Sequence, residues 1–551
     1  MSVSAHPVAT YATGRPSPAP RVFVLPTWSD VAQIPRRGHG SKVGIDQVIP
    51  SPLQPLVRAY LLGYASSVAP RLLTVLLTYF TAYHRQRRGL PLAHSEMASF
   101  AYVRGSMRRI LRAGLEWRRF PTFCATLIGG STLLEIPFRR LLAQCAPGLS
   151  LVARTRLSRW LASFVAAYGS LRLLQSKQTP GFTETVIVNP DTNSVHESTA
   201  EAEVENKAPH TKATAAKAVT PTAITIPYAG RTLDLTLFAV TRALDVIVGE
   251  LWARRKARRV ALSTWTGLEA LVGRLTDPAI FATSSALVMW AWFYVPSRLP
   301  HAYNKWITSA AAVDSRLINA LRLCRAGQLQ YGKDLGPDAR LLEDMARDYN
   351  WPLSWGDPAV TVPFPCTMVH MDCGPSCEYH ALIRMLRSWR WSMATYLPLS
   401  LVLVLRKPYR NPRGVLRAII SAMRSSAFLG AFITLFFYGV CLARTRIGPL
   451  ILGKSVAARQ AIDSGLCTAV GCGLCGWSIL VERASRRKDM GLFVAPRALA
   501  TLLPRRYALD KQWRETLVFA ASTAVVFTAI QENPKRVRGV MGGILKIVLV
   551  P

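Results

Sequence analysis

The sequence predicts an all-α polytopic membrane protein, with about eight short transmembrane helices in two parallel four-helix repeats. The first of three observations behind this prediction is composition. Of the 551 residues, 50% are hydrophobic and the mean hydropathy is positive, yet 68 Lys and Arg stand against 31 Asp and Glu, a net charge of +37. Basic loops that join apolar helices explain both properties, because Lys and Arg concentrate at the ends of membrane spans. A soluble nucleic-acid-binding protein would explain the charge but not the hydropathy, so we expect no nucleic-acid partner.

The second observation is a series of apolar segments. Most contain only about 14–18 strongly apolar residues, fewer than the roughly 20 of a comfortable span. Arg residues flank them, and long basic side chains that reach the interface lengthen a short span. A buried helix of a soluble domain is the alternative for any single segment, whereas eight together favour contact with a lipid bilayer. The segments are 56–80, 120–138, 160–174, 279–296, 391–405, 426–443, 464–481 and 516–530.

The third observation is a similarity between the two halves of the chain. The matched segments keep their order, and their offset falls from 309 to 255 to 238 residues. A polar insertion at 176–230 accounts for the first fall, so we interpret the pattern as a duplication, with chance similarity between apolar helices as the alternative. An even number of spans in each copy would give both copies the same orientation. The matched segments are 104–114 with 413–423, 237–244 with 492–499, and 281–296 with 519–534.

These observations divide the chain into four regions. Residues 1–50 are rich in Pro, Ser and Ala and lack an apolar signal sequence, which predicts a disordered N-terminal tail. Residues 51–320 form the first repeat, interrupted by the insertion 176–230, which has no periodicity and is predicted to be disordered. A connector at 321–380 contains Cys and His, and the second repeat follows at 381–551.

Clusters of Arg and Lys lie at both ends of successive spans. The positive-inside rule therefore gives no orientation, which favours an organelle membrane reached after synthesis. Contact with anionic lipid head groups is worth about 1 kcal/mol per basic residue near the surface, so such lipids are expected partners. The oligomeric state is open, a homo-oligomer included. The clusters are 85–88, 104–119, 139–140, 154–159, 254–259, 384–390, 406–417, 444–446, 483–488 and 505–514.

The densest group of chemically reactive side chains lies in the connector. It contains Cys366, His370, Cys373 and Cys377, within a turn rich in Gly and Pro. Such ligands could bind Zn²⁺, but the usual Cys-x₂-Cys pairs are missing. A disulfide within the loop would require an oxidising compartment. We favour free thiols that pack the connector, and so predict a structural Cys/His cluster with no metal and no cofactor.

Small residues in the seventh apolar segment predict close helix packing, because they fall on one helical face. The packing residues are Gly465, Ala469, Gly473 and Gly476. Cys472 and Cys475 have the spacing of a redox dithiol, but they lie in the same apolar helix and are predicted to serve packing.

Two acidic residues lie in or beside the apolar segments. An ionisable group inside a span is expensive and marks a functional site by default. Glu135 is close to Arg139 and Arg140, which predicts local ion pairing. Asp463 precedes a span and is predicted to lie near a helix N-cap. No phosphate-binding loop or nucleophile–base set is visible, so no catalytic residue and no enzyme activity are predicted.

Two long segments of the second half carry a family resemblance. After the Cys/His connector comes RGVLRAIISAMRSSAFLGAFITLFFYGVCLARTRIG, and later CGLCGWSILVERASRRKDMGLFVAPRALATLL precedes a short final helix. These segments resemble the transmembrane protein 135 family, also called peroxisomal membrane protein 52, in a fungal-type form. The resemblance covers about 363–545 and is weaker in the first half, where the insertion 176–230 is a departure. The small-residue spans are also distantly similar to the inner-membrane translocase channel family, the Tim17/22/23 type.

The resemblance implies a multi-spanning protein of mitochondrial and peroxisomal membranes that acts in membrane dynamics or lipid homeostasis. It implies no catalytic residues, and it makes the connector between Cys366 and Cys377 a family-like element without an assigned role. A transporter is the second hypothesis, which would place a polar cavity between the repeats, within reach of Glu135. A translocase-like component, with a groove open to lipid, is the third.

Overall fold

The computed structural model describes residues 50–87, 100–188, 222–334, 336, 341–371, 373–405 and 412–549. This part of the chain is helical apart from short turns and one two-stranded sheet, which confirms the all-α prediction. The predicted N-terminal tail, except residue 50, lies outside the described residues.

Each predicted apolar segment lies wholly or largely in helical structure. Local signals account for several boundaries: Ser150 caps α7, Thr266 and Glu269 form a capping box at α9, and Pro412 begins α15. The helices that contain these segments are α3 (Gln54–Arg87), α5 (Phe120–Leu133), α6 (Glu135–Cys145), α7 (Leu151–Gln175), α9 (Gly267–Tyr294), α14 (Cys377–Leu405), α15 (Pro412–Leu442), α18 (Cys467–Cys475) with η9 (Gly476–Val481), and α20 (Gln512–Glu532).

Further helices connect or flank these. They are α4 (Phe100–Gly114), α8 (Leu233–Ala261), α10 (His301–Ala311), α11 (Ser315–Ala326), α12 (Leu341–Asp348), α13 (Cys366–Val369), α16 (Gly448–Leu452), α17 (Val456–Ala461), α19 (Ala484–Leu502) and α21 (Gly539–Leu549). Two π-helical segments, η7 (Ala443–Ile447) and η8 (Ile462–Leu466), make α15–α16 and α17–α18 continuous.

Only four helices in the described part of the chain are long and apolar enough to cross a membrane, not the predicted eight. They are Gln54–His84, Pro412–Leu452, Val456–Val481 and Leu509–Glu532. The other apolar segments are too short or too often interrupted by polar residues. At 1.5 Å per residue, the 14 residues of α5 reach about 21 Å, well below a hydrocarbon core of about 30 Å. One of the four candidates lies in the first half of the chain and three in the second, so four spans per repeat are not supported.

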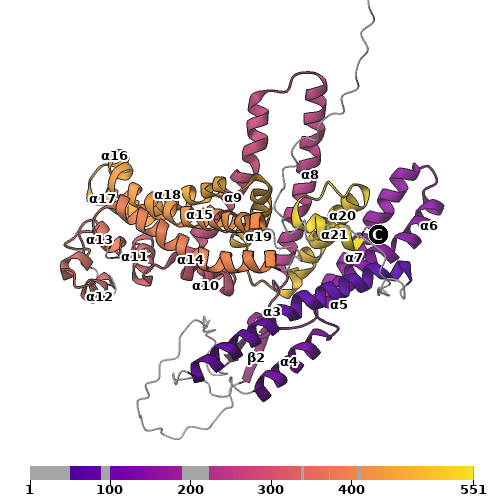
Figure 1. The fold of residues 1–551 in the computed structure, drawn as a ribbon, viewed down its shortest axis with the longest axis horizontal. Coiled ribbons are helices and arrows are strands. Elements are labelled where there is room, and N and C mark those ends of the chain that lie inside the picture. Colours follow the sequence, from indigo (N-terminus) through magenta and orange to yellow (C-terminus); the bar gives the residue numbers. More distant parts are fainter. Residues whose placement is uncertain are drawn as a thin grey trace, which may run out of the picture.

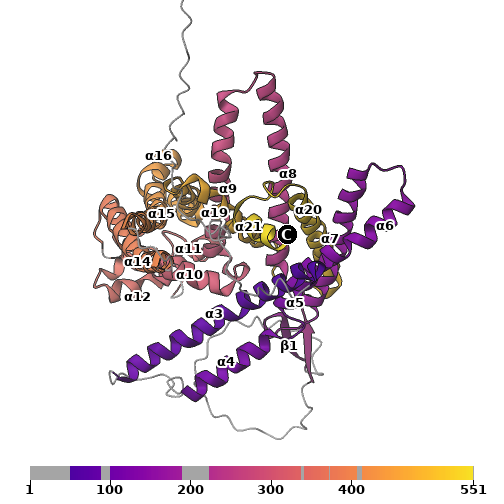
Figure 2. The same ribbon diagram turned by 45° about the vertical axis from the view of Figure 1, so that its right-hand side comes forward.

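The helices pack into two bundles. Each bundle consists mainly of helices from one half of the chain and includes one helix from the other half. The first bundle consists of α3, α5, α7 and α8 together with α20, and the second of α14, α15, α18 and α19 together with α9. Figures 1 and 2 both show yellow α20 beside the purple helices α5 and α7. The Phe123 and Phe519 rings lie 6.0 Å apart in the first core, and the Phe293 and Phe436 rings stack at 5.2 Å in the second. Contacts between α8 and α19 join the two bundles.

The predicted insertion 176–230 is ordered at both ends, which corrects the prediction of disorder there. Strands β1 (Thr183–Val188) and β2 (Thr222–Pro227) pair antiparallel, from Thr183 opposite Pro227 to Val188 opposite Thr222. Both strands are rich in β-branched Thr, Val and Ile, which favour extended structure. Residues 189–221 lie outside the described part of the chain.

Two further features place the candidate sites. The α8–α9 hairpin projects from the body of the molecule (Figure 1) and carries the basic cluster 254–259, of which Arg255 and Arg259 pair with Glu269. The connector has a small core of its own, formed by α11, α12, α13 and the intervening turns, in which Leu329 and Met345 are fully buried.

Candidate functional site

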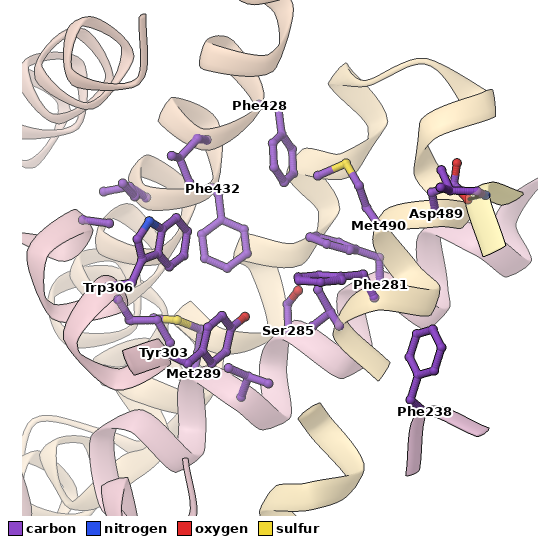
Figure 3. A pocket seen from close by; sticks show the side chains of 18 of the residues that line it. Phe238, Phe281, Ser285, Met289, Tyr303, Trp306, Phe428, Phe432, Asp489 and Met490 are labelled. Carbon is purple, nitrogen blue, oxygen red and sulfur yellow. Dashed lines mark hydrogen bonds between the residues drawn. The ribbon is translucent and has the colours of Figure 1, made fainter. Parts of the chain in front are cut away.

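A cavity of about 770 Å³ lies between the two bundles. This volume falls in the range of about 300–1,000 Å³ typical of ligand pockets. Helices α8, α9, α10, α14, α15, α19 and α21 all contribute to its wall. Figure 3 shows Trp306 and Asp489 at opposite ends of the view, so one end of the cavity carries an indole ring and the other a carboxylate.

One end of the cavity is aromatic and apolar. The rings of Phe281 and Phe428 meet edge to face at 5.7 Å, and Figure 3 shows Phe432, Tyr303 and Trp306 around the same space. Trp306 is 45% exposed, so this end reaches the molecular surface. Such a surface suits a hydrocarbon chain, because burial of apolar area stabilises a complex by roughly 25 cal/mol per Å².

The other end is polar and charged. Arg242 is 7% exposed and its Nη1 donates to the carbonyl of Arg538 at 3.2 Å, but its Nε is buried without a partner. Burial lowers the pKa of Arg242, while Asp245 and Asp489 oppose that effect. Asp489 also accepts from the amide of Val540 at 3.3 Å. A buried donor without a partner costs about 1–3 kcal/mol, so this end is suited to a polar group of a ligand.

The structure brings together three of the four predicted Cys/His residues. The donor atoms of Cys366, His370 and Cys377 all lie within 4.8 Å of one another. Cys373 is outside this group, whereas Cys441 contacts one member of it, with its Sγ 3.3 Å from His370 Nε2. All ten cysteines are free. Burial, the largest effect, raises the pKa of the Cys366 thiol and lowers that of His370.

Two of the four residues predicted to serve helix packing are closely packed, and two are not. A Cβ on Gly476 would come within 2.4 Å of Ala282 Cα, and one on Gly465 within 2.8 Å of Arg325, so both positions are closely packed. Gly473 has open space around it, and Ala469 is exposed. Gly465 has a φ of +140° within η8, and this irregular turn rotates the following helix away from the regular spacing that the prediction assumed. Cys472 and Cys475 are buried in the second core, which confirms their packing role.

The prediction for Glu135 is confirmed, and the prediction for Asp463 is wrong. Glu135 pairs with Arg139 at 2.8 Å and with Arg159 at 3.1 Å, which confirms local pairing. Asp463 is not at a helix N-cap: it is 1% exposed inside the continuous helix and pairs with Arg444. The sequence gives no local signal for this pair, because Arg444 lies in the basic cluster 444–446, which is predicted to flank a span.

The cavity and the role of Cys441 were also missed. Both depend on helices that are far apart in the sequence, and no local spacing points to them. Comparison with protein-family models, with curated proteins and with solved structures finds no significant similarity.

Proposed function

We propose that this chain is an integral membrane protein that binds a lipid or a similar amphiphile in the cavity between its two bundles. The observation that carries the proposal is the chemistry of that cavity. Its aromatic end, around Phe281 and Phe428, suits an acyl chain, and its polar end, at Arg242 and Asp489, suits a head group. Ligand sites between helices are typically apolar with a few polar groups that fix orientation.

Exposed apolar side chains support an environment of lipid. Long stretches of α3 are open to the surroundings, with Leu73, Leu77 and Phe80 each more than half exposed. Leu450 and Ile451 at α16 are 86% and 73% exposed. Soluble proteins rarely expose contiguous apolar surface on this scale, because it costs free energy in water. The basic clusters would then contact anionic head groups at the membrane surface.

The proposed role is non-enzymatic and lies in lipid homeostasis or membrane dynamics of mitochondria or peroxisomes. Its support is the resemblance of residues 363–545 to the transmembrane protein 135 family, together with a cavity that suits lipid.

A duplicated architecture is part of this proposal. Helices α10 and α21 each have 11 residues, and each follows α9 or α20 after six residues. The first residues of α10 and α21 are 238 positions apart, and so are their last residues. The matched segments 281–296 and 519–534 have the same offset. The reciprocal packing of α9 and α20 in the opposite bundle is the arrangement that two related halves would produce.

The test is lipid binding by the full chain in detergent. We expect native mass spectrometry to find a bound lipid in the wild-type protein and in Leu287→Trp, a matched variant on the outer side of α9, where Leu287 is 38% exposed. Met289→Trp places extra volume in the cavity wall and should remove the lipid. Equal lipid binding by all three proteins would contradict the proposal.

Transport is the second candidate, favoured by the buried Arg242 and the half-buried Asp489 in the wall of the cavity. Reconstitution into vesicles separates the two functions. A transporter moves its substrate across the bilayer, and Arg242→Gln should abolish that movement. A binding protein retains lipid without any flux.

A further inference from the structure

We propose that Cys366, His370, Cys377 and Cys441 together bind one zinc ion. Three thiolates and one imidazole form a Cys₃His set, one of the standard donor sets of structural zinc sites. The proposal is independent of lipid binding in the cavity, and it replaces the interpretation of these cysteines as free packing thiols.

Three of the four donor atoms lie in one group, and the fourth, Cys441 Sγ, lies against the imidazole of His370. Zn–S and Zn–N bonds of about 2.0–2.3 Å place neighbouring donors roughly 3.3–3.8 Å apart. His370 Nε2 is 3.3 Å from Cys441 Sγ, and Cys366, His370 and Cys377 offer donors within 4.8 Å of one another. The Cys377 thiol interacts electrostatically with the thiols of both Cys366 and Cys441, so the three sulfur atoms lie in one neighbourhood.

The imidazole of His370 is held for metal binding by its other nitrogen. His370 Nδ1 lies 2.7 Å from the carbonyl oxygen of Gly374, so Nδ1 carries the proton and donates it. Nε2 then presents its lone pair to the group of thiols. A zinc-bound His almost always donates its second ring N–H to a carbonyl or carboxylate, which fixes both the tautomer and the ring orientation. His380 stacks on the ring at 4.4 Å and holds its plane.

The surrounding charges suit the site. Three thiolates and Zn²⁺ together carry one negative charge, which is expensive to bury without a cation nearby. Arg444 is 5% exposed, and its charge acts on both Cys366 and His370. Arg384 is 2% exposed, and its charge also acts on His370. Because Arg444 is already paired with Asp463, Arg384 is the buried guanidinium that offsets the charge of the occupied site.

The ligands come from separate elements, which indicates what the ion does. Cys366 lies at the start of α13, and His370 follows its end; Cys377 begins α14, and Cys441 lies at the end of α15. One ion at this place would fasten the connector to the α14–α15 helix pair. Structural zinc sites contribute their binding free energy directly to folding.

The experiment measures zinc in the full chain, purified in detergent through an affinity tag without histidine. Elemental analysis should find about one zinc per chain in the wild type. Cys366→Ser, Cys377→Ser and Cys441→Ser should each lose most of it. The matched control is Cys373→Ser, in the same loop but outside the donor group, and it should keep the wild-type content. Wild-type protein without zinc, or Cys441→Ser with full zinc content, would overturn the proposal.

A second measurement does not depend on variants that fold. Wild-type protein stripped by a chelator should lose thermal stability and regain it when zinc alone is added. Cobalt added in place of zinc should give the strong visible absorption of a tetrahedral site with thiolate ligands. Peptide mapping that finds a disulfide between Cys366 and Cys377 in protein from native membranes would overturn the proposal.

Discussion

Arg444 and Asp463 form a bidentate ion pair in the interior of the protein. Arg444 Nε and Nη2 donate to the two carboxylate oxygens at 2.7 and 2.9 Å, and the side chains are 5% and 2% exposed. Tyr331 donates to the same carboxylate at 2.5 Å, and Arg444 also donates to the carbonyl of Phe364 at 3.1 Å. Because Tyr331 and Phe364 belong to the connector, the pair joins two candidate spans to each other and to the connector.

Loss of one partner of this pair should destabilise the protein strongly. Arg444→Met leaves the Asp463 charge buried without compensation, which typically costs about 3–5 kcal/mol. The measurement is thermal unfolding of the full chain in detergent. Arg446→Met is the matched control, because Arg446 pairs with Glu378 at the surface, where a salt bridge is worth about 0–1 kcal/mol. Equal losses of stability in both variants would show that burial of the pair is not what matters.

Two glycines of the same helical region should respond oppositely to a methyl group. Gly476→Ala places a Cβ within 2.4 Å of the Ala282 backbone and should destabilise the protein by about 1–3 kcal/mol or more. Gly473→Ala meets nothing within 4 Å and should leave the melting temperature unchanged or slightly raised. The two variants differ only in position, so the comparison isolates the packing of η9 on α9. A larger loss in Gly473→Ala would contradict the packing described here.

An ion cluster at the turn between α4 and α5 should give acid-dependent stability. Hydrogen bonds from Lys177 and Arg119 lower the pKa of Glu116 from 4.5 to about 2. A carboxylate with a lowered folded-state pKa stabilises the protein fully above its unfolded pKa, and the effect is lost as pH falls towards the folded value. The wild type should therefore melt above Glu116→Gln at neutral pH. That difference should shrink between pH 4.5 and about 2. A constant difference across the range would exclude Glu116 as its source.

The exchange of helices between bundles can be tested with a split chain. If the chain is divided within 189–221, α7 lies on one fragment and α20 on the other, and their packing should make the fragments purify together. Phe519→Ala removes a ring that is 2% exposed in the first core, at a typical cost of about 3–5 kcal/mol, and should release the fragments. Val518→Ala, at a neighbouring position that is 47% exposed, should not. Release by both variants would argue against this packing.

Local sequence determined most of the helices. Apolar stretches bounded by Arg, Pro and capping residues located them, because helix formation depends on hydrogen bonds and side chains within a few residues. The pairing of Glu135 with Arg139 is local in the same sense. The number of spans was predicted wrongly, because four of the eight apolar segments counted as spans are too short or too polar to cross a bilayer.

Tertiary structure alone decided the candidate sites. Cys441 contacts His370, Arg444 pairs with Asp463, and the cavity lies between α9, α15 and α19, because helices far apart in the sequence pack side by side. The turn at Gly465 likewise selects which face of α18 is buried, against the regular spacing of its small residues. Sequence spacing specifies contacts along one helix, whereas contacts between helices depend on which faces the folded chain brings together, and no single segment of this sequence contains that information.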